Sequence, residues 1–416
     1  MNGAEGRAAA TGDEGHPADR TARPPAHARP PLAGPAQLPA DEGRFERHAL
    51  IPGWDQRRLA GATVVLAGAG ALGNTVAQTL ALAGLGRLVV CDPDTVAVSN
   101  LSRCPLFRPA DVGRPKARVL AEALADLAPG TTVEAREAPH VSGAGLAELR
   151  DAVLVVSALD SRAARISLAG RCTLAGTGML DGGTHAWGGE VSWWPPGGRC
   201  WACGLNPAER AVRDDPWSCA APGPTDAVGA SAPVSALVGA WLANVAVRLL
   251  LGLSVPGAPL RIDAAGLAVP LSGTAPRDRP EPDCPLHERL PDDVPVLPLG
   301  QDATVERLLS HVGMHEEPLT WAGFSRPVRR RSAVPAITSR LRSAPASARL
   351  SALGVAPREV LPVARRDGSG LRYVELAGRV GEEGTPRGDL AEWAPGADAR
   401  PGESARGRRV TTEGVR

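Results

Sequence analysis

The sequence almost lacks lysine. Lysine and arginine together number 46 among 416 residues, and the only lysine is Lys116. The arginine excess, together with 48 glycines and 40 prolines, is typical of GC-rich coding, which accounts for the loss of lysine but not for its retention at one position. Because an ammonium group and a guanidinium group differ in size and in hydrogen-bond geometry, Lys116 is a candidate functional residue.

The sequence also lacks a strong net charge and a secretory signal. Its formal net charge of +1 gives no general attraction to nucleic acid or to a membrane surface, so neither is expected as a partner. The N-terminal residues show no positively charged segment followed by an apolar one and a cleavage site. The seven cysteines are therefore expected to be reduced, metal-bound or catalytic rather than paired in disulfides, in a cytoplasmic protein.

Composition divides the chain into four predicted parts. Residues 1–43 and 386–416 are rich in Ala, Pro, Gly and Arg, and we expect both to be disordered tails. Between them we expect a main domain over 44–290 and a small α+β extension over 291–385.

One apolar run, residues 228–251, approaches the length of a membrane span. Pro233, Asn244 and Arg248 interrupt it, and a buried helix is therefore favoured over a span.

Residues 63–92 fit a β–turn–α–β unit. TVVLAG (63–68) and RLVVCD (87–92) are apolar runs typical of buried strands, and residues 74–86 predict a helix between them. The turn GAGALG contains three glycines, Gly68, Gly70 and Gly73. Such a turn lets backbone approach a phosphate at a helix N-terminus, and Asp92 lies where a carboxylate binds ribose. Taken alone, the pattern also fits a dehydrogenase, or a glycine turn that packs helix on strand without a ligand.

Polar residues beyond Asp92 favour a triphosphate over a nicotinamide dinucleotide. Asn100, Arg103 and Lys116 offer phosphate oxygens a hydrogen-bond donor, a bidentate fork and a point charge. No P-loop replaces them, because Lys116 is followed by Ala117 instead of Ser or Thr.

A further apolar strand is predicted over 152–160, and it ends at Asp160. Ligands of open parallel sheets bind at the carboxyl ends of strands, so Asp160 is placed to hold a magnesium ion that bridges phosphates. Alternatively, Asp160 caps the helix predicted over 161–170. Arg162 and Arg165 lie on that helix, and the sequence fits either of two roles for them: ligand-binding residues or solvated surface.

In combination, these motifs resemble the ThiF/MoeB/HesA family, relatives of the ubiquitin-activating enzymes, from about Arg44 to His287. The resemblance implies that Arg47, in RFERH (44–48), reaches the triphosphate from the partner subunit of a homodimer. It also implies that Asp92 binds ribose and that Asp160 binds magnesium. The nucleotide-binding set that it implies is Gly68, Gly70, Ala71, Gly73, Asp92, Ser99, Asn100, Leu101, Ser102, Arg103, Lys116, Asp160 and Ser161.

Four positions depart from the family pattern. Ala71 stands where a glycine is usual, and the residues that directly follow Arg47, Arg103 and Asp160 also differ: His48, Cys104 and Ser161. All four lie beside the principal contacts. Adenylation therefore remains the expected reaction, whereas the carrier-protein partner is less constrained.

CWAC (200–203) and CPLH (284–287) have the spacing of two metal-binding pairs. Three thiolates and an imidazole complete a tetrahedral zinc site, with the ligands Cys200, Cys203, Cys284 and His287. Four protein ligands leave no open position, so this zinc is predicted to be structural. A lone CxxC also fits a redox pair, but the second pair favours zinc. Members of the resembled family usually carry four cysteines, which makes His287 a variation.

Cys219 lies in a Pro- and Gly-rich stretch where we expect a loop. In the resembled family, a cysteine in the corresponding loop accepts a thioester, persulfide or acyl disulfide, so Cys219 is a candidate covalent residue. An exposed thiol without a role is the alternative. Cys91 and Cys172 fall in apolar patterns and are expected in the core.

The resemblance ends at about Val294. Residues 304–313 predict a short helix, and residues 361–376 predict a hairpin turned at Asp-Gly. RPVRRR (326–331) fits either an acidic partner or a solvated loop.

The sequence therefore predicts a Rossmann-like α/β fold: a mostly parallel sheet with helices on both faces, a structural zinc site and a small α+β extension. The predicted function is an ATP- and Mg2+-dependent adenylyltransferase that activates a C-terminal carboxylate, with a ubiquitin-like sulfur carrier as the favoured substrate. Adenylation of a ribosomal peptide or a small carboxylate is the nearer alternative. A nicotinamide-dependent oxidoreductase and a non-catalytic binding module are alternatives of other classes.

Overall fold

The computed structural model describes residues 43–210, 229–255, 257, 259–263, 280–282, 284, 286–321 and 337–378. All of them fall within one compact unit, Pro35–Arg416. The two predicted tails, Cys219 and the basic run 326–331 lie outside the described residues, apart from Gly43.

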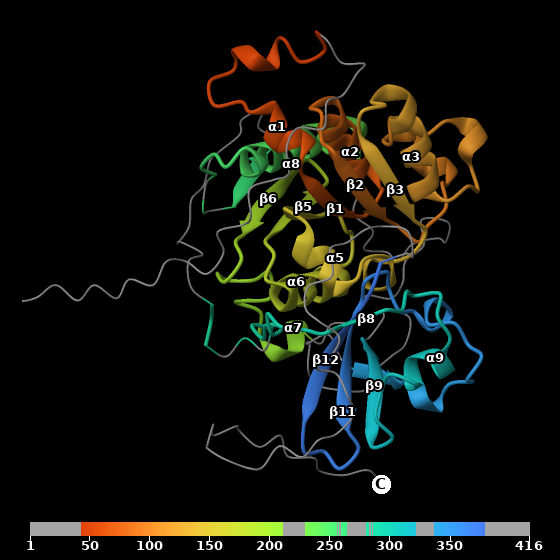
Figure 1. The fold of residues 1–416 in the computed structure, drawn as a ribbon. Helices are drawn as coiled ribbons and strands as arrows, with labels where there is room; N and C mark the ends of the chain where they lie inside the picture. Colours follow the sequence, from red (N-terminus) through yellow and green to blue (C-terminus); the bar gives the residue numbers. More distant parts are fainter. Residues whose placement is uncertain are drawn as a thin grey trace, which may run out of the picture. The chain divides into compact units, whose positions relative to one another are not determined.

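The larger sheet has seven strands, of which five are parallel (Figure 1). Its spatial order is β3 (Thr132–Arg136), β2 (Arg87–Cys91), β1 (Thr63–Ala67), β4 (Leu154–Ser157), β5 (Met179–His185), β6 (Gly188–Trp194) and β7 (Leu260–Asp263). The last two strands pair antiparallel to their neighbours. From β1 the chain goes to β2 and β3 on one side and then returns to β4 on the other, so strand order reverses between β1 and β4. Such a reversal is where ligands bind in open α/β sheets.

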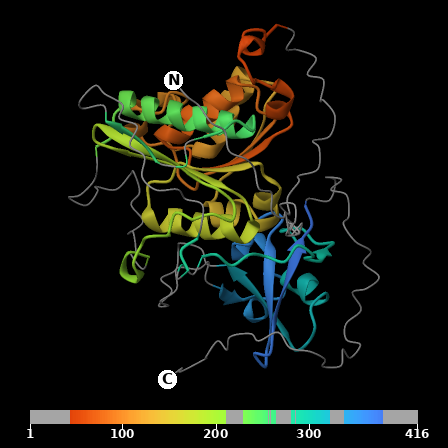
Figure 2. The ribbon, with the colours of Figure 1, turned by 90° about the vertical axis from the view of Figure 1, so that its left-hand side faces the viewer.

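Helices cover both faces of this sheet, as Figure 2 shows. The helices are α1 (Gln56–Ala60), α2 (Ala71–Leu82), α3 (Lys116–Leu127), α4 (His140–Gly143), α5 (Leu146–Asp151), α6 (Arg162–Ala175), α7 (Pro207–Arg210) and α8 (Ala232–Leu250). Alternate residues of β1 enter different hydrophobic clusters: Val64 and Leu66 pack with α2, α3 and α8, whereas Val65 and Ala67 pack with α5 and α6. A strand buried on both faces needs a continuous apolar run, which TVVLA provides.

Helix α8 is the apolar run singled out in the sequence. It is long and apolar enough to span a membrane, yet 56% of its most apolar window is buried inside the structure. Its buried side chains include Val238, Leu242 and Ala246, which belong to the same cluster as those of α2. The prediction of a buried helix is confirmed.

A second sheet follows, with five strands and the short helix α9 (Val305–Leu309). Its order is β10 (Ile337–Arg340), β9 (Glu316–Trp321), β11 (Val360–Arg365), β12 (Leu371–Leu376) and β8 (Val296–Leu297). Strands β11 and β12 form the predicted antiparallel hairpin. The second sheet has its own apolar cluster, which includes Leu308, Leu361 and Val374.

Buried polar contacts join this second sheet to α5 and α6. Arg171 of α6 is fully buried and lies 2.8 Å from the carboxylate of Glu359, which also accepts the backbone N–H of Leu146 at 3.1 Å. Trp321 and Val360 share a hydrophobic cluster with the two helices. The boundary between a main domain and an extension at about residue 290 therefore stays a prediction, because the described residues on its two sides share core contacts.

Candidate functional site

The glycine turn lies at the point where strand order reverses. Gly68 follows β1 with a φ of +102°, and a Cβ there would lie 2.6 Å from the carbonyl oxygen of Ala158, which follows β4. A Cβ on Gly73 would lie 2.0 Å from the carbonyl oxygen of Gly68. Both positions therefore require glycine. Helix α2 begins at Ala71 with Gly70 as its N-cap, and its first N–H groups have no carbonyl partner within the helix.

Asn74 holds this turn in place, and sequence reasoning missed it. Its side chain is fully buried and donates to the carbonyls of Ala69 at 2.8 Å and Gly70 at 3.1 Å. Its Oδ1 accepts the backbone N–H of Leu106 at 3.2 Å, which connects the turn to the segment after Arg103. An asparagine directly behind the last glycine of the turn was the available signal.

Asp92 lies at the carboxyl end of β2 and contacts the same turn. It is 6% exposed, and its two carboxylate oxygens accept the backbone N–H groups of Ala69 at 2.6 Å and Asp94 at 2.8 Å. Burial raises the pKa of Asp92, while the charge of Lys116 and these two hydrogen bonds act in the opposite direction. Each carboxylate oxygen can accept more than one hydrogen bond, so capacity remains for a ribose hydroxyl.

Lys116 is buried next to Asp92. Its Nζ lies 2.8 Å from Oδ2 of Asp94, and the residue is 3% exposed. The backbone N–H of Lys116 also donates to the carbonyl of Asp94 at 2.9 Å. The structure therefore brings the only lysine of the chain to the carboxyl end of β2, against two carboxylates and near the glycine turn.

The segment between Asp92 and Lys116 forms a 3-10 turn, Val98–Ser102. Asn100 is buried, and its Oδ1 accepts the backbone N–H of Ala97 at 2.9 Å. Arg103 follows the turn, and its guanidinium donates to the carbonyl of Ser99 at 2.7 Å. Ser99 and Ser102 are exposed, whereas Leu101 is half-buried. The side chain of Asn100 thus stabilises the backbone of the turn, and the guanidinium of Arg103 lies at the surface.

Asp160 is exposed in the connection from β4 to α6. The N-cap of α6 is Ser161, whose Oγ accepts the backbone N–H of Ala164 at 3.1 Å. The alternative that Asp160 caps this helix is therefore wrong. Because β1, β2 and β4 are parallel neighbours, Asp160 shares one edge of the sheet with the glycine turn and Asp92.

Arg47 lies in a different part of the structure, on the segment before α1. It is exposed and precedes a 3-10 turn, His48–Leu50. Leu50 and Ile51 beside it are 73% and 47% exposed. Phe45, two residues before Arg47, packs at Gly84 after the C-terminal end of α2, whereas the glycine turn precedes the N-terminal end of that helix.

The four predicted metal ligands come together. Their ligand atoms, from Cys200, Cys203, Cys284 and His287, all lie within 4.8 Å of one another. Sγ of Cys200 is 3.9 Å from Sγ of Cys203 and 3.7 Å from Sγ of Cys284. A tetrahedral zinc site with Zn–S bonds of about 2.3 Å has S–S edges of about 3.8 Å, so the cluster fits zinc. The hydrogen bond between Cys200 and Cys203 holds the pKa of Cys203 below its usual range and raises that of Cys200.

The other described cysteines are buried. Burial raises the pKa of Cys91 and of Cys172 to about 12, which suits inert core thiols. Cys104 is 2% exposed and packs in the cluster of α2 and α3. The prediction that Cys91 and Cys172 belong to the core is confirmed.

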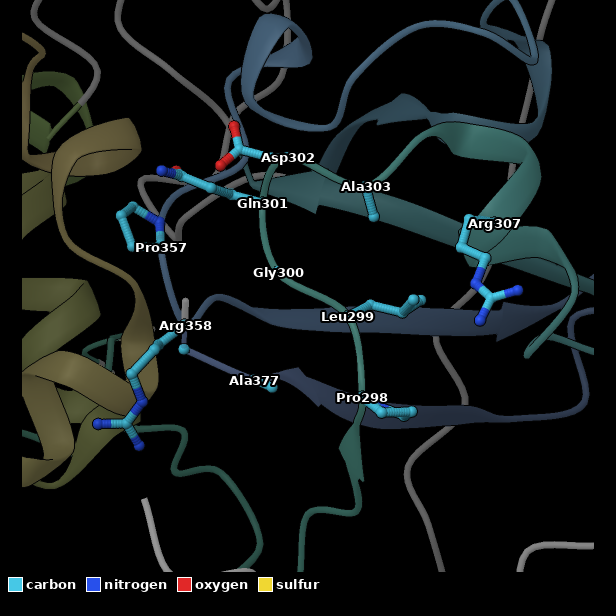
Figure 3. A pocket seen from close by; sticks show the side chains of 11 residues that line it. Pro298, Leu299, Gly300, Gln301, Asp302, Ala303, Arg307, Pro357, Arg358 and Ala377 are labelled. Carbon is cyan, nitrogen blue, oxygen red and sulfur yellow. The ribbon is translucent and has the colours of Figure 1, made fainter. Parts of the chain in front are cut away.

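A cavity of about 520 Å³ lies at the second sheet, away from these residues (Figure 3). Its lining includes Gln301, Asp302, Arg307 and Arg358, and none of the nucleotide-binding residues predicted from the sequence. Figure 3 shows the side chains of Asp302, Arg307 and Arg358 pointing in different directions. Arg358 is engaged by Asp151 and Glu375. Without convergent polar groups, this cavity is a poor candidate for the reacting site.

Comparisons with known proteins match the same part of the chain. The model of the ThiF family matches residues 45–286. A sulfur carrier protein adenylyltransferase of Thermus thermophilus is 35% identical over 222 residues, which cover 51% of this chain and 79% of that protein. A SAMP-activating enzyme E1 of Haloferax volcanii is 32% identical over 249 residues, covering 58% of this chain and 87% of that protein. Among solved structures, E. coli MccB with MccA-N7isoASN shares 20% identity at a TM-score of 0.48, over 59% of this chain and 74% of that one.

The family match spans more than half of the chain, and it contains the glycine turn, Asp92, Lys116 and Asp160. The chain belongs to the ThiF family.

Proposed function

We propose that the protein is an ATP-dependent adenylyltransferase that activates a C-terminal carboxylate as an acyl-adenylate and releases pyrophosphate. One observation carries the proposal: the glycine turn, Asp92 and the buried Lys116 meet at the carboxyl edge of the parallel sheet. Membership of the ThiF family and two relatives named as an adenylyltransferase and an activating enzyme support this reaction.

Each residue of the site is proposed to bind a different part of ATP, according to its charge. Asp92 holds the ribose, and the free N–H groups at the start of α2 face the phosphates. Lys116 and Arg103 neutralise the charge that develops as the carboxylate oxygen bonds to the α-phosphorus and the bond to pyrophosphate breaks. Asp160 would hold magnesium, which would supply charge neutralisation to the phosphates. The attacking carboxylate is already a nucleophile, so alignment replaces a general base.

The four-ligand cluster is proposed to hold one structural zinc. Cys200, Cys203, Cys284 and His287 fill a tetrahedral shell and leave no open position for a substrate. The ligands join the segment after β6 to the segment before β8, which are 84 residues apart at the Cys200–Cys284 contact. Metal binding therefore stabilises the connection between the two.

The proposed substrate is a ubiquitin-like sulfur carrier, on the basis of the names of the two relatives. The proposed assembly is a homodimer in which Arg47 reaches the triphosphate of the partner subunit. Arg47 is exposed, and the nearby Phe45 packs at Gly84, beyond the end of α2 that is opposite to the glycine turn. The alternative substrates are a ribosomal peptide and a small carboxylate, and the test below compares them with the carrier protein.

The test is carboxylate-dependent exchange of labelled pyrophosphate into ATP. Carrier proteins ending in Gly-Gly, short peptides and small carboxylates are compared as substrates. Lys116→Ala and Asp160→Ala are each expected to lose on the order of a hundredfold in exchange rate, as for removal of a transition-state charge contact. Arg118→Ala, at an exposed residue on the same helix as Lys116, is the control and should exchange at the parent rate. Unchanged exchange in both site variants, or binding of NADH without binding of ATP, contradicts the proposal.

A further inference from the structure

Arg165 holds the connection that carries Asp160. This arginine lies in the first turn of α6, and its side chain is 16% exposed. Its Nε and Nη2 both donate to the carbonyl of Leu159, at 3.0 and 2.5 Å, and Nη2 also donates to the carbonyl of Gly182 at 3.2 Å. The planar guanidinium thus fixes the residue directly before Asp160 against β5.

Asp181 of β5 fixes Arg165 in turn. It is 5% exposed, and its Oδ2 lies 2.9 Å from Nη1 of Arg165. A buried charge is stable only when it is paired, so Arg165 and Asp181 depend on each other. Asp181 is the register partner of Ser157, the last residue of β4. Asp181 therefore lies beside the point where the connection to Asp160 begins.

Trp201 connects Asp181 to the metal-binding cluster. Its Nε1 donates to the same Oδ2 of Asp181 at 3.0 Å. Trp201 stands between the two ligands of the first cysteine pair, Cys200 and Cys203, so its backbone position depends on that pair. A continuous series of polar contacts therefore runs from Trp201, which the backbone links to the cysteine pair, through Asp181 and Arg165 to the Leu159 carbonyl.

We propose that Arg165 and Asp181 are positioning residues that hold Asp160 for the magnesium–ATP complex, and that Trp201 couples this position to the four-ligand cluster. The inference rests on the proposed function, because Asp160 needs fixing only if it holds magnesium. A metal-binding carboxylate on an exposed connection needs neighbouring residues to fix its position. Contacts that orient a metal ligand in this way raise the affinity for the metal. The metal cluster thus has a second role beyond joining two segments.

The test measures the binding of ATP to the full-length protein by calorimetry across a series of Mg2+ concentrations. Trp201→Phe removes the Nε1 donor and keeps the ring, Asp181→Asn removes the charge, and Arg165→Lys removes the fork. Each is expected to raise the Mg2+ concentration for half-maximal ATP binding on the order of tenfold or more, as loss of an outer-shell contact does. At saturating Mg2+ the affinity for ATP should return to that of the parent, which a general folding defect does not allow.

Two control variants match the chemistry of the changes. Trp321→Phe also removes an indole donor, to the carbonyl of Val360 at 2.7 Å, but in the second sheet. Arg118→Lys changes an exposed arginine on α3 that is not among the candidate site residues. Both should keep the Mg2+ dependence of the parent. The zinc content of every variant is measured and is expected to be one per chain. If Trp201→Phe loses zinc, the positioning role is judged from Asp181→Asn, because Asp181 does not belong to the ligand pair.

The outcomes separate this inference from the proposed function. Parent-like Mg2+ dependence in both Asp181→Asn and Arg165→Lys overturns the positioning role. A loss of ATP binding at every Mg2+ concentration, together with a loss of folded structure by circular dichroism, also overturns it, because the contacts then serve folding alone. If the parent binds ATP without dependence on Mg2+, or Asp160→Ala leaves that dependence unchanged, the role of Asp160 itself is wrong.

Discussion

Nζ of Lys116 lies 2.8 Å from Oδ2 of Asp94 inside a site where Lys116 is 3% exposed. The backbone around the pair is also fixed: Val96 donates to the carbonyl of Arg114 at 2.8 Å, and Lys116 donates to that of Asp94 at 2.9 Å. A compact ammonium fits this enclosed position, whereas a guanidinium is larger and planar. This relationship gives a physical reason for a single lysine in an arginine-rich chain.

The pair predicts that arginine cannot replace Lys116. Lys116→Arg keeps the charge but should lose pyrophosphate exchange on the order of a hundredfold, close to the loss in Lys116→Ala, because the charge is displaced from the phosphates. Arg118→Lys, the reverse change at an exposed residue of the same helix, is the control and should leave exchange unchanged. Parent-like exchange in Lys116→Arg would mean that the lysine is a chance survivor.

Parts of the fold were predictable because their signals are local. β1 and β2 lie within two residues of the predicted bounds, since a strand buried on both faces is a continuous apolar run. β3 was not predicted: Thr132–Arg136 is an edge strand with a half-buried, mixed sequence, TVEAR, and has no such run. Helix α2 begins at Ala71, three residues before its predicted start, because the helix begins inside the glycine turn.

The site was predictable as a set of residue types but not as a set of contacts. Asp92 ends an apolar strand after the glycine turn, Lys116 is the only lysine, and the metal ligands form two pairs with fixed spacing. Arg165 was interpreted as solvated surface as readily as a ligand, yet it pairs with Asp181. That contact depends on which strand lies beside β4, and sequence patterns do not determine strand order. The contact of Trp201 with Asp181 depends on it in the same way.

A homodimer is predicted from the position of Arg47. Arg47→Ala and Lys116→Ala proteins should each be inactive in pyrophosphate exchange. When the two are mixed and allowed to exchange subunits, about a quarter of the sites should be intact, because half of the dimers are mixed and one of their two sites has both residues. Light scattering measures the assembly. A fully active monomer refutes the role of Arg47 in the partner subunit.

Zinc binding is predicted to depend on ligand chemistry at each position. Protein purified without chelator should contain one zinc per chain by elemental analysis. His287→Cys should keep the metal, because thiolate and imidazole both suit tetrahedral zinc. Cys203→Ser should lose the metal and lower the melting temperature, since metal binding and folding are coupled. His185→Cys, an exposed position on β5, is the control for an added thiol. Zinc-free parent protein contradicts the assignment.

The burial of His140 leads us to expect a lower free energy of unfolding in mild acid. It is 3% exposed on α4, and burial, followed by the charge of Arg171, lowers its pKa to about 3. Between that value and the ordinary value near 6.5, the unfolded chain binds a proton that the folded chain does not, so stability falls as pH falls. From pH 7 to 5.5 this residue alone should cost about 1 kcal/mol of unfolding free energy. Urea titrations should show that loss reduced in His140→Gln and unchanged in His315→Gln, an exposed control.

Cys219 is the residue on which a covalent step after adenylation would depend. Among the other cysteines, Cys200, Cys203 and Cys284 belong to the metal cluster, and Cys91, Cys104 and Cys172 are buried. Cys219 lies outside the described residues, so its assignment rests on this elimination and on the family resemblance.

Adenylation uses only the carboxylate, and Cys219→Ala should therefore keep the parent rate of pyrophosphate exchange. The same variant should abolish transfer of sulfur or of the acyl group, measured as a carrier–enzyme adduct by mass spectrometry without reducing agent. Cys104→Ala is the matched control, because its thiol packs in the core and should be dispensable for the adduct. If Cys219→Ala completes transfer at the parent rate, the enzyme releases its adenylate to an external thiol, and the chain performs no covalent step of its own.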